Sequence, residues 1–185
     1  MTPLARAEFP AFERLASRIC GSSNFRVAWQ MFQCDGPCKA TPRTARQILE
    51  TACLVPELHL FLAPEVRDQW PSRLHLHEHC TIEPAAGSFE NILARAVSDR
   101  LGAYSHSLAE ATCDEMGGVR DVFNGLGSYV PFELVPGGVP GCATCQEHNS
   151  HLFSEWFYAV AWDWCHCIIW EARKLALLWC MSDTD

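Results

Sequence analysis

The chain has 185 residues, of which 49% are hydrophobic and 19% are charged, and this composition excludes an intrinsically disordered protein. The length suits one compact domain, so a single domain over residues 1–185 is expected. The formal net charge of −8 argues against binding to nucleic acids or anionic membranes, because both require a basic face.

The first third of the chain predicts two helices on either side of a strand. Apolar residues at helical spacing precede Gly21, which is expected to end the first helix; these residues are Phe9, Phe12, Ala16 and Ile19. Residues 24–32 alternate between apolar and polar side chains, as in a half-buried strand. A tight turn is expected over "CDGPC" at residues 34–38. Thr41 and Pro42 then resemble the N-cap and first residue of a second helix.

The middle of the chain predicts two strands followed by two helices. The strands are expected at residues 57–62 and 73–83, the second of which largely alternates. Ser88 is expected to cap a helix that carries Phe89 and Leu93 and breaks at Gly102. A further helix is expected to stop at Gly117-Gly118, and Gly125 and Gly127 are interpreted as helix-stop or turn residues.

The last third predicts strands around an irregular loop. Pro131 favours an edge strand or a loop for "SYVPFELV", because proline cannot donate a ladder hydrogen bond. Residues 157–165, 166–172 and 174–181 are rich in aromatic and aliphatic side chains and indicate an antiparallel β-meander. The whole pattern predicts an α+β fold, with N-terminal and central helices packed on an antiparallel sheet that ends in this C-terminal meander.

The loop "PGCATCQEHNSH" is the first candidate metal site. Cys142 and Cys145 form a C-x2-C pair on a glycine-rich turn, and His148 and His151 could complete the four nitrogen or sulfur ligands that zinc prefers. Four ligands in one short loop are cramped, so a second pair could come from Cys34 and Cys38, from Cys165 and Cys167, or from the histidine-rich strand described next. The sequence alone does not decide whether a metal is bound.

A histidine-rich strand is the second candidate. On a strand, His75, His77 and His79 project from one face, where they could hold a metal ion and leave a position open for water or substrate. His77, His79 and Glu83 resemble the first metal motif of cupins, although the glycine that precedes the cupin histidines is absent here. This reading implies a metal-dependent enzyme of cupin-like or zinc-hydrolase-like chemistry, with Glu83 as ligand or general base.

The segment "WDWCHC" is interpreted as core packing. Alternation along a strand places Cys165 and Cys167 on one face and His166 on the other, so the cysteine and histidine cannot act together as a nucleophile and base.

The leading functional hypothesis is a small acidic protein that binds a protein partner, as an antagonist or regulator, with zinc at the Cys/His loop as an open question. No assembled catalytic set is visible, and seven Trp and ten Phe residues suit an aromatic core or interface. The end of the chain is similar to the terminal strands of SUKH-type immunity proteins, without their Gly-Asp turn. Eleven cysteines with no visible signal peptide and no apolar membrane span indicate a reducing, cytoplasmic location. The alternative is the metal-dependent enzyme described above.

Overall fold

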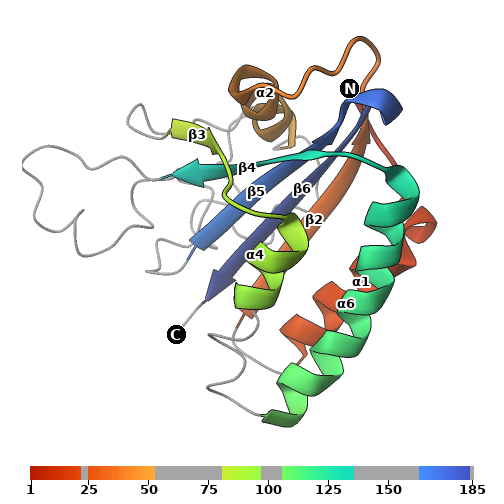
Figure 1. Cartoon of the computed structure of the whole chain (residues 1–185), viewed down its shortest axis with the longest axis vertical. Coiled ribbons are helices and arrows are strands. Elements are labelled where there is room, and N and C mark those ends of the chain that lie inside the picture. The colour runs from red at the N-terminus through yellow and green to blue at the C-terminus, as the bar shows by residue number, and fades with distance from the viewer. Residues whose placement is uncertain (22–24, 53–80, 97–105, 136–162, 184–185) are drawn as a thin grey trace, which may run out of the picture.

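A computed structural model describes residues 1–21, 25–52, 81–96, 106–135 and 163–183 of the chain (Figure 1). In chain order the elements are β1 (Thr2–Pro3), η1 (Arg6–Glu8), α1 (Pro10–Cys20), β2 (Phe25–Gln33), α2 (Pro42–Ala52), β3 (Thr81–Pro84), α4 (Phe89–Ala96), α6 (His106–Leu126), β4 (Val130–Val135), β5 (Asp163–Trp170), η5 (Glu171–Arg173) and β6 (Leu175–Asp183).

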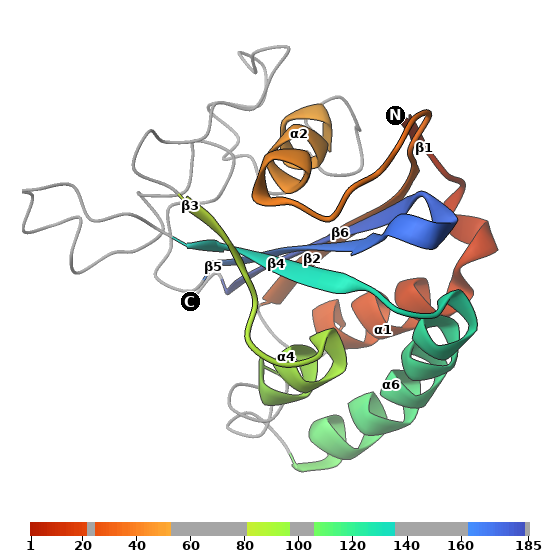
Figure 2. The same cartoon turned by 45° about the horizontal axis from the view of Figure 1, so that its top comes forward.

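The strands form one six-stranded sheet in the order β1-β2-β6-β5-β4-β3, and every neighbouring pair is antiparallel. Helix α2 covers one face of the sheet, and α1, α4 and α6 cover the other (Figure 2). The predicted α+β fold is therefore confirmed.

Each face of the sheet carries its own buried layer. The side chains between the sheet and α2 form a layer, here called the cysteine layer. Besides aliphatic residues and two phenylalanines, it contains Cys34, Cys38, Cys165, Cys167 and Cys180. The opposite side forms an aromatic layer that contains Phe12, Trp29, Phe89, Phe123, Trp170 and Trp179. Strand β6 lies between the two layers and is buried on both faces, which explains its nearly continuous apolar run.

Capping residues that are visible in the sequence mark where the described helices begin and end. The Thr41 hydroxyl accepts a hydrogen bond from the Thr44 N–H at 3.2 Å, and α2 begins at Pro42 as predicted. Ser88 caps α4 in the same way, since its hydroxyl accepts from the Asn91 N–H at 3.2 Å. Gly21 ends α1, and its N–H bonds to the Ser17 carbonyl at 2.9 Å.

The predicted helix stop at Gly117-Gly118 is wrong, because α6 continues through both glycines to Leu126. Helix α6 packs against α1 here, and a Cβ atom on Gly118 would lie 3.5 Å from the Cβ of Ala11. Packing between the two helices outweighs the low helix propensity of glycine. The real stop is Gly127, which has a φ of +87° and donates its N–H to the Phe123 carbonyl.

The prediction of an edge strand or loop around Pro131 is also wrong. Strand β4 is an inner strand, with β5 on one side and β3 on the other. The Pro131 carbonyl accepts from the Ala85 N–H at 2.9 Å, so its ring nitrogen faces the same side. Pro131 lies one step beyond Pro84 and Phe132, the last register pair of β3 and β4, so only the end of that ladder loses the bond that a proline nitrogen cannot donate.

The part of the predicted C-terminal meander that the structure describes contains two strands, β5 and β6. Strand β5 runs without a break from Asp163 to Trp170, across the boundary expected between Cys165 and His166. It pairs with β6 as a hairpin, in which Lys174 adopts a left-handed conformation with a φ of +53°. Residues 157–162 lie outside the described residues, as does the strand expected at 57–62.

Candidate functional site

One cross-strand row brings three ionisable residues of the sheet into line on one face. The register pairs Glu83 with Glu133, Glu133 with His166, and His166 with Trp179. Side chains directly opposite in a sheet share a face. Two carboxyl groups and one imidazole therefore follow one another from the β3 edge toward the middle of the sheet.

His166 is the buried member of this row. Its Nε2 atom lies 3.9 Å from a carboxylate oxygen of Glu133, and its ring meets the ring of Phe89 edge-on at 6.2 Å. Burial lowers the pKa of His166 to about 4, so the imidazole is neutral at pH 7. A neutral imidazole with 5% of its surface exposed has little access to a substrate, and neither of the two described pockets contains it.

Glu83 is the one residue of the predicted histidine-rich site that the structure describes. It lies on the exposed edge of β3, where its carboxylate accepts a hydrogen bond from the Thr81 hydroxyl at 3.1 Å. His75, His77 and His79 lie outside the described residues. The enzyme therefore stays a prediction. Glu83 has a cross-strand neighbour, Glu133, that the sequence interpretation did not connect with it, and Glu133 in turn stands opposite His166.

The cysteine layer brings together both thiol pairs that were considered as partners for the Cys/His loop. The Sγ atoms of Cys34 and Cys38 lie 2.6 Å apart at the end of β2. In the neighbouring strands, Cys165 and Cys180 stand opposite each other with their Sγ atoms 3.6 Å apart. As predicted, Cys167 shares the face of Cys165, and His166 lies on the other face.

Burial controls the protonation of these thiols. Burial first, and then the contact with Cys34, raises the pKa of Cys38 to about 12. Burial, followed by the proximity of Cys165, Cys38 and Cys34, also raises the pKa of the Cys167 thiol. Within the described ranges, no three Cys, His, Asp or Glu side chains are grouped so that they could hold a metal ion. Cys142, Cys145, His148 and His151, the predicted zinc ligands, lie outside those ranges.

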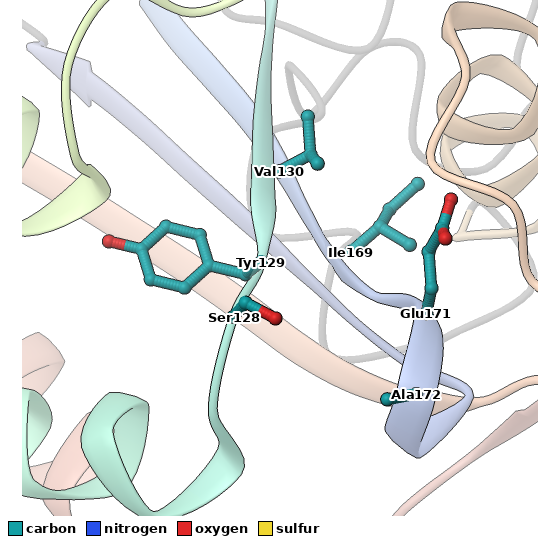
Figure 3. Close-up of a pocket in the computed structure, with 6 residues that line it drawn as sticks. All are labelled: Ser128, Tyr129, Val130, Ile169, Glu171 and Ala172. Atoms are coloured by element: carbon teal, nitrogen blue, oxygen red, sulfur yellow. The ribbon is translucent and has the colours of Figure 1, made fainter.

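A pocket of about 470 Å³ opens at one end of the sheet, where the start of β4 meets the β5–β6 hairpin (Figure 3). Its lining residues are Ser128, Tyr129, Val130, Ile169, Glu171 and Ala172. Val130, Ile169 and Glu171 project to one side of the sheet, and the Tyr129 ring points to the other. Among the residues that the structure describes, Val130 is the exposed large hydrophobic side chain, with 37% of its surface accessible.

Neighbouring hydrogen bonds hold two walls of this pocket in place. The Glu171 carboxylate accepts from the Ala40 N–H at 2.5 Å, which ties the hairpin to the loop before α2. The Tyr129 hydroxyl donates to Glu90 at 2.7 Å and accepts from the Phe89 N–H at 3.3 Å. Burial would raise the pKa of Glu90, but hydrogen bonds from Tyr129 and Ser88 hold it below its ordinary value.

The pocket was missed by sequence reasoning because two distant segments form it. Residues 128–130 and 169–172 are far apart in the sequence, and the pairing of Val130 with Ile169 and the contact between the Tyr129 and Trp170 rings bring them together. A second hollow of about 420 Å³ lies between α1 and α6 and is lined mainly by charged residues, including Arg14 and Glu115, which form an ion pair at 3.1 Å. The apolar and mixed character of the first pocket makes it the stronger candidate binding site.

No helix in the described part of the chain is both long and apolar enough to cross a membrane. Three comparisons with known proteins found no protein-family model, no curated protein and no solved structure that matches this chain.

Proposed function

We propose that this protein acts by binding another protein, and that the pocket beside Val130 anchors the partner. The observation that carries the proposal is the accessible Val130 side chain, which lies in a pocket with a carboxylate and a hydroxyl at its border. An apolar centre with a polar border is the usual composition of a protein interface.

The chemistry of the pocket suggests what the partner presents. An aliphatic or aromatic side chain would cover Val130, while an N–H or hydroxyl group would bond to Ser128 or Glu171. The formal charge of −8 on the whole chain favours a basic partner through long-range attraction. A soluble protein with a basic surface and one apolar anchor residue fits these requirements.

Support for binding over catalysis comes from the groups near the pocket. Glu171 and Tyr129 are its ionisable lining residues. The Glu171 carboxylate already accepts the Ala40 N–H, and the Tyr129 hydroxyl, whose pKa burial raises to about 12, already donates to Glu90. His166, the buried base described above, lies on the face of the sheet opposite Val130 and Ile169. The enzyme alternative depends on His75, His77 and His79, and the zinc depends on Cys142 and Cys145, so both remain sequence predictions.

Site-specific photo-crosslinking tests the proposal. A photoreactive benzoylphenylalanine placed at Val130 of the full chain, in its native host, is expected to capture one partner that mass spectrometry identifies. The same residue at Ser17, in the charged hollow between α1 and α6, serves as the matched control and should not capture it. With that partner purified, Val130→Asp should weaken binding at least about tenfold by calorimetry, and Ser17→Asp should not.

Equal capture from both positions, or the same affinity for both Asp variants, would contradict the proposed site. No capture at Val130 would contradict it as well.

A further inference from the structure

We propose that Cys34 and Cys38 form a reversible disulfide, which makes the turn at residues 34–38 a site of covalent thiol modification. The two sulfur atoms face each other at 2.6 Å across the Asp-Gly-Pro turn. A disulfide bond measures about 2.05 Å, so the bond can form with a small local movement. This site does not depend on the proposed partner pocket.

The backbone on both sides of the turn is anchored to the β5–β6 hairpin. The Cys34 N–H donates to the Lys174 carbonyl at 2.8 Å. Two residues after Cys38, the Ala40 N–H donates to the Glu171 carboxylate. These bonds limit how far the two thiols can separate, and a pair held together in this way reacts as if at high local concentration.

The environment of the pair favours a disulfide over a bound metal. Cys34 and Cys38 are 9% and 5% exposed and belong to the apolar cysteine layer. Burial, followed by the contact with Cys34, raises the pKa of Cys38 to about 12, so this site suits a neutral thiol or a disulfide. A disulfide carries no charge, so it can be buried in the apolar cysteine layer as the neutral thiols are. No third ligand among the described residues joins them as a metal-binding group.

The oxidant is a small-molecule disulfide such as glutathione disulfide. The sulfur of Cys34, the more exposed of the pair, attacks one glutathione sulfur, and the other leaves as a thiolate that takes up the Cys34 proton. Cys38 then gives its proton to solvent and attacks the Cys34 sulfur, which releases the second glutathione as a thiolate that takes up a proton from solvent. Two electrons and two protons pass from the cysteine pair to glutathione disulfide, which becomes two molecules of glutathione.

The other described thiols provide internal comparisons. Cys165 and Cys180 also face each other, but they are 3% and 0% exposed and lie within the central hairpin, where glutathione cannot reach. Cys113 is exposed on α6. It should form a mixed disulfide with glutathione but should not affect the Cys34–Cys38 pair.

Peptide mass spectrometry tests the proposal directly. The folded full chain is equilibrated with glutathione and glutathione disulfide, blocked with N-ethylmaleimide and digested with trypsin. The expected peptide, residues 27–39, contains Cys34 and Cys38 as its two cysteines. It should appear with two hydrogens missing and without the blocking group. Cys38→Ser should instead carry glutathione on Cys34, and Cys113→Ser should behave as the wild type at residues 27–39.

A comparison with denatured protein separates the effect of the fold from that of the short loop. The native chain should be oxidised at this pair with an equilibrium constant at least about tenfold larger than the chain in guanidinium chloride. A wild-type peptide that stays fully blocked, carries glutathione, or is linked to a peptide that contains Cys165 or Cys167 would overturn the proposal. Equal constants in both states would do the same.

Discussion

His166 is a buried base whose protonation opposes folding. Its pKa falls from an ordinary value of 6.5 to about 4 because burial penalises the imidazolium. Above pH 6.5 the imidazole is neutral in both the folded and unfolded states, so it does not affect stability. As the pH falls from 6.5 to 4, His166 binds a proton in the unfolded chain but stays largely neutral in the folded chain. The free energy of unfolding therefore decreases.

This linkage predicts that acidic pH destabilises the wild type more than it destabilises a His166 variant. Between pH 7 and pH 4 the wild type should lose about 3 kcal/mol more stability than His166→Gln, measured from urea unfolding at each pH. Glu133→Gln is the control, because burial and not the Glu133 carboxylate at 3.9 Å causes the shift, and it should keep most of the loss. Parallel curves for the wild type and His166→Gln would show that the folded protein accepts the proton.

At the residue scale, alternation alone was enough to separate Cys165 and Cys167 from His166. It could not show that His166 would stand opposite Glu133, or that Glu133 would stand opposite Glu83. Those neighbours depend on the register between strands that are distant in the sequence. Pairing energies depend on the whole sheet, so no local signal identifies them.

Helix α6 tests how glycine behaves inside a long helix. A Cβ atom on Gly117 would meet no atom within 4 Å, and one on Gly118 would make ordinary contacts with Ala11 and Arg14 at 3.5 Å. Gly117→Ala and Gly118→Ala should therefore each stabilise the protein by about 0.5–1 kcal/mol, because alanine loses less backbone entropy. Gly127→Ala is the opposite control: its φ of +87° should make it destabilising by about 1 kcal/mol.

Thermal and urea unfolding of the three glycine variants measures these changes. Destabilisation by Gly118→Ala would mean that α1 and α6 approach too closely for a methyl group, which the 3.5 Å spacing contradicts.

At the element scale, the sequence predicts those helix and strand boundaries that are determined by residues close together in the chain. Thr41 and Ser88 mark the starts of α2 and α4 because each cap bonds to a backbone N–H three residues later. The predictions at Gly117-Gly118 and Pro131 are wrong because contact with another helix or strand determines the structure there. Helix α1 packs against α6, and β3 ends just where the proline would otherwise break a ladder.

The whole molecule consists of two buried layers that share one sheet. Strands β5 and β6 contribute to both layers, since their successive side chains alternate between the cysteine layer and the aromatic layer. The composition indicated an aromatic core or interface, but it could not place the buried rings of Trp29, Trp170 and Trp179 on one face and the buried thiols of the cysteine layer on the other. That division follows from the register and from which helices cover each face.

A shared sheet predicts that the two layers unfold together. Ile48→Ala in the cysteine layer should cost about 2–5 kcal/mol, and Phe12→Ala in the aromatic layer about 3–5 kcal/mol, because both side chains are fully buried. The fluorine signals of fluorotryptophan at Trp29, Trp170 and Trp179 report on the aromatic layer alone. Single Trp→Phe changes assign these signals. In both alanine variants, the urea midpoint of unfolding that these signals report should be lower, together with the midpoint reported by the circular dichroism of the helices. If Ile48→Ala lowered the stability of α2 but left the three tryptophan transitions at the wild-type midpoint, the layers would be independent units, and the sheet would not couple them.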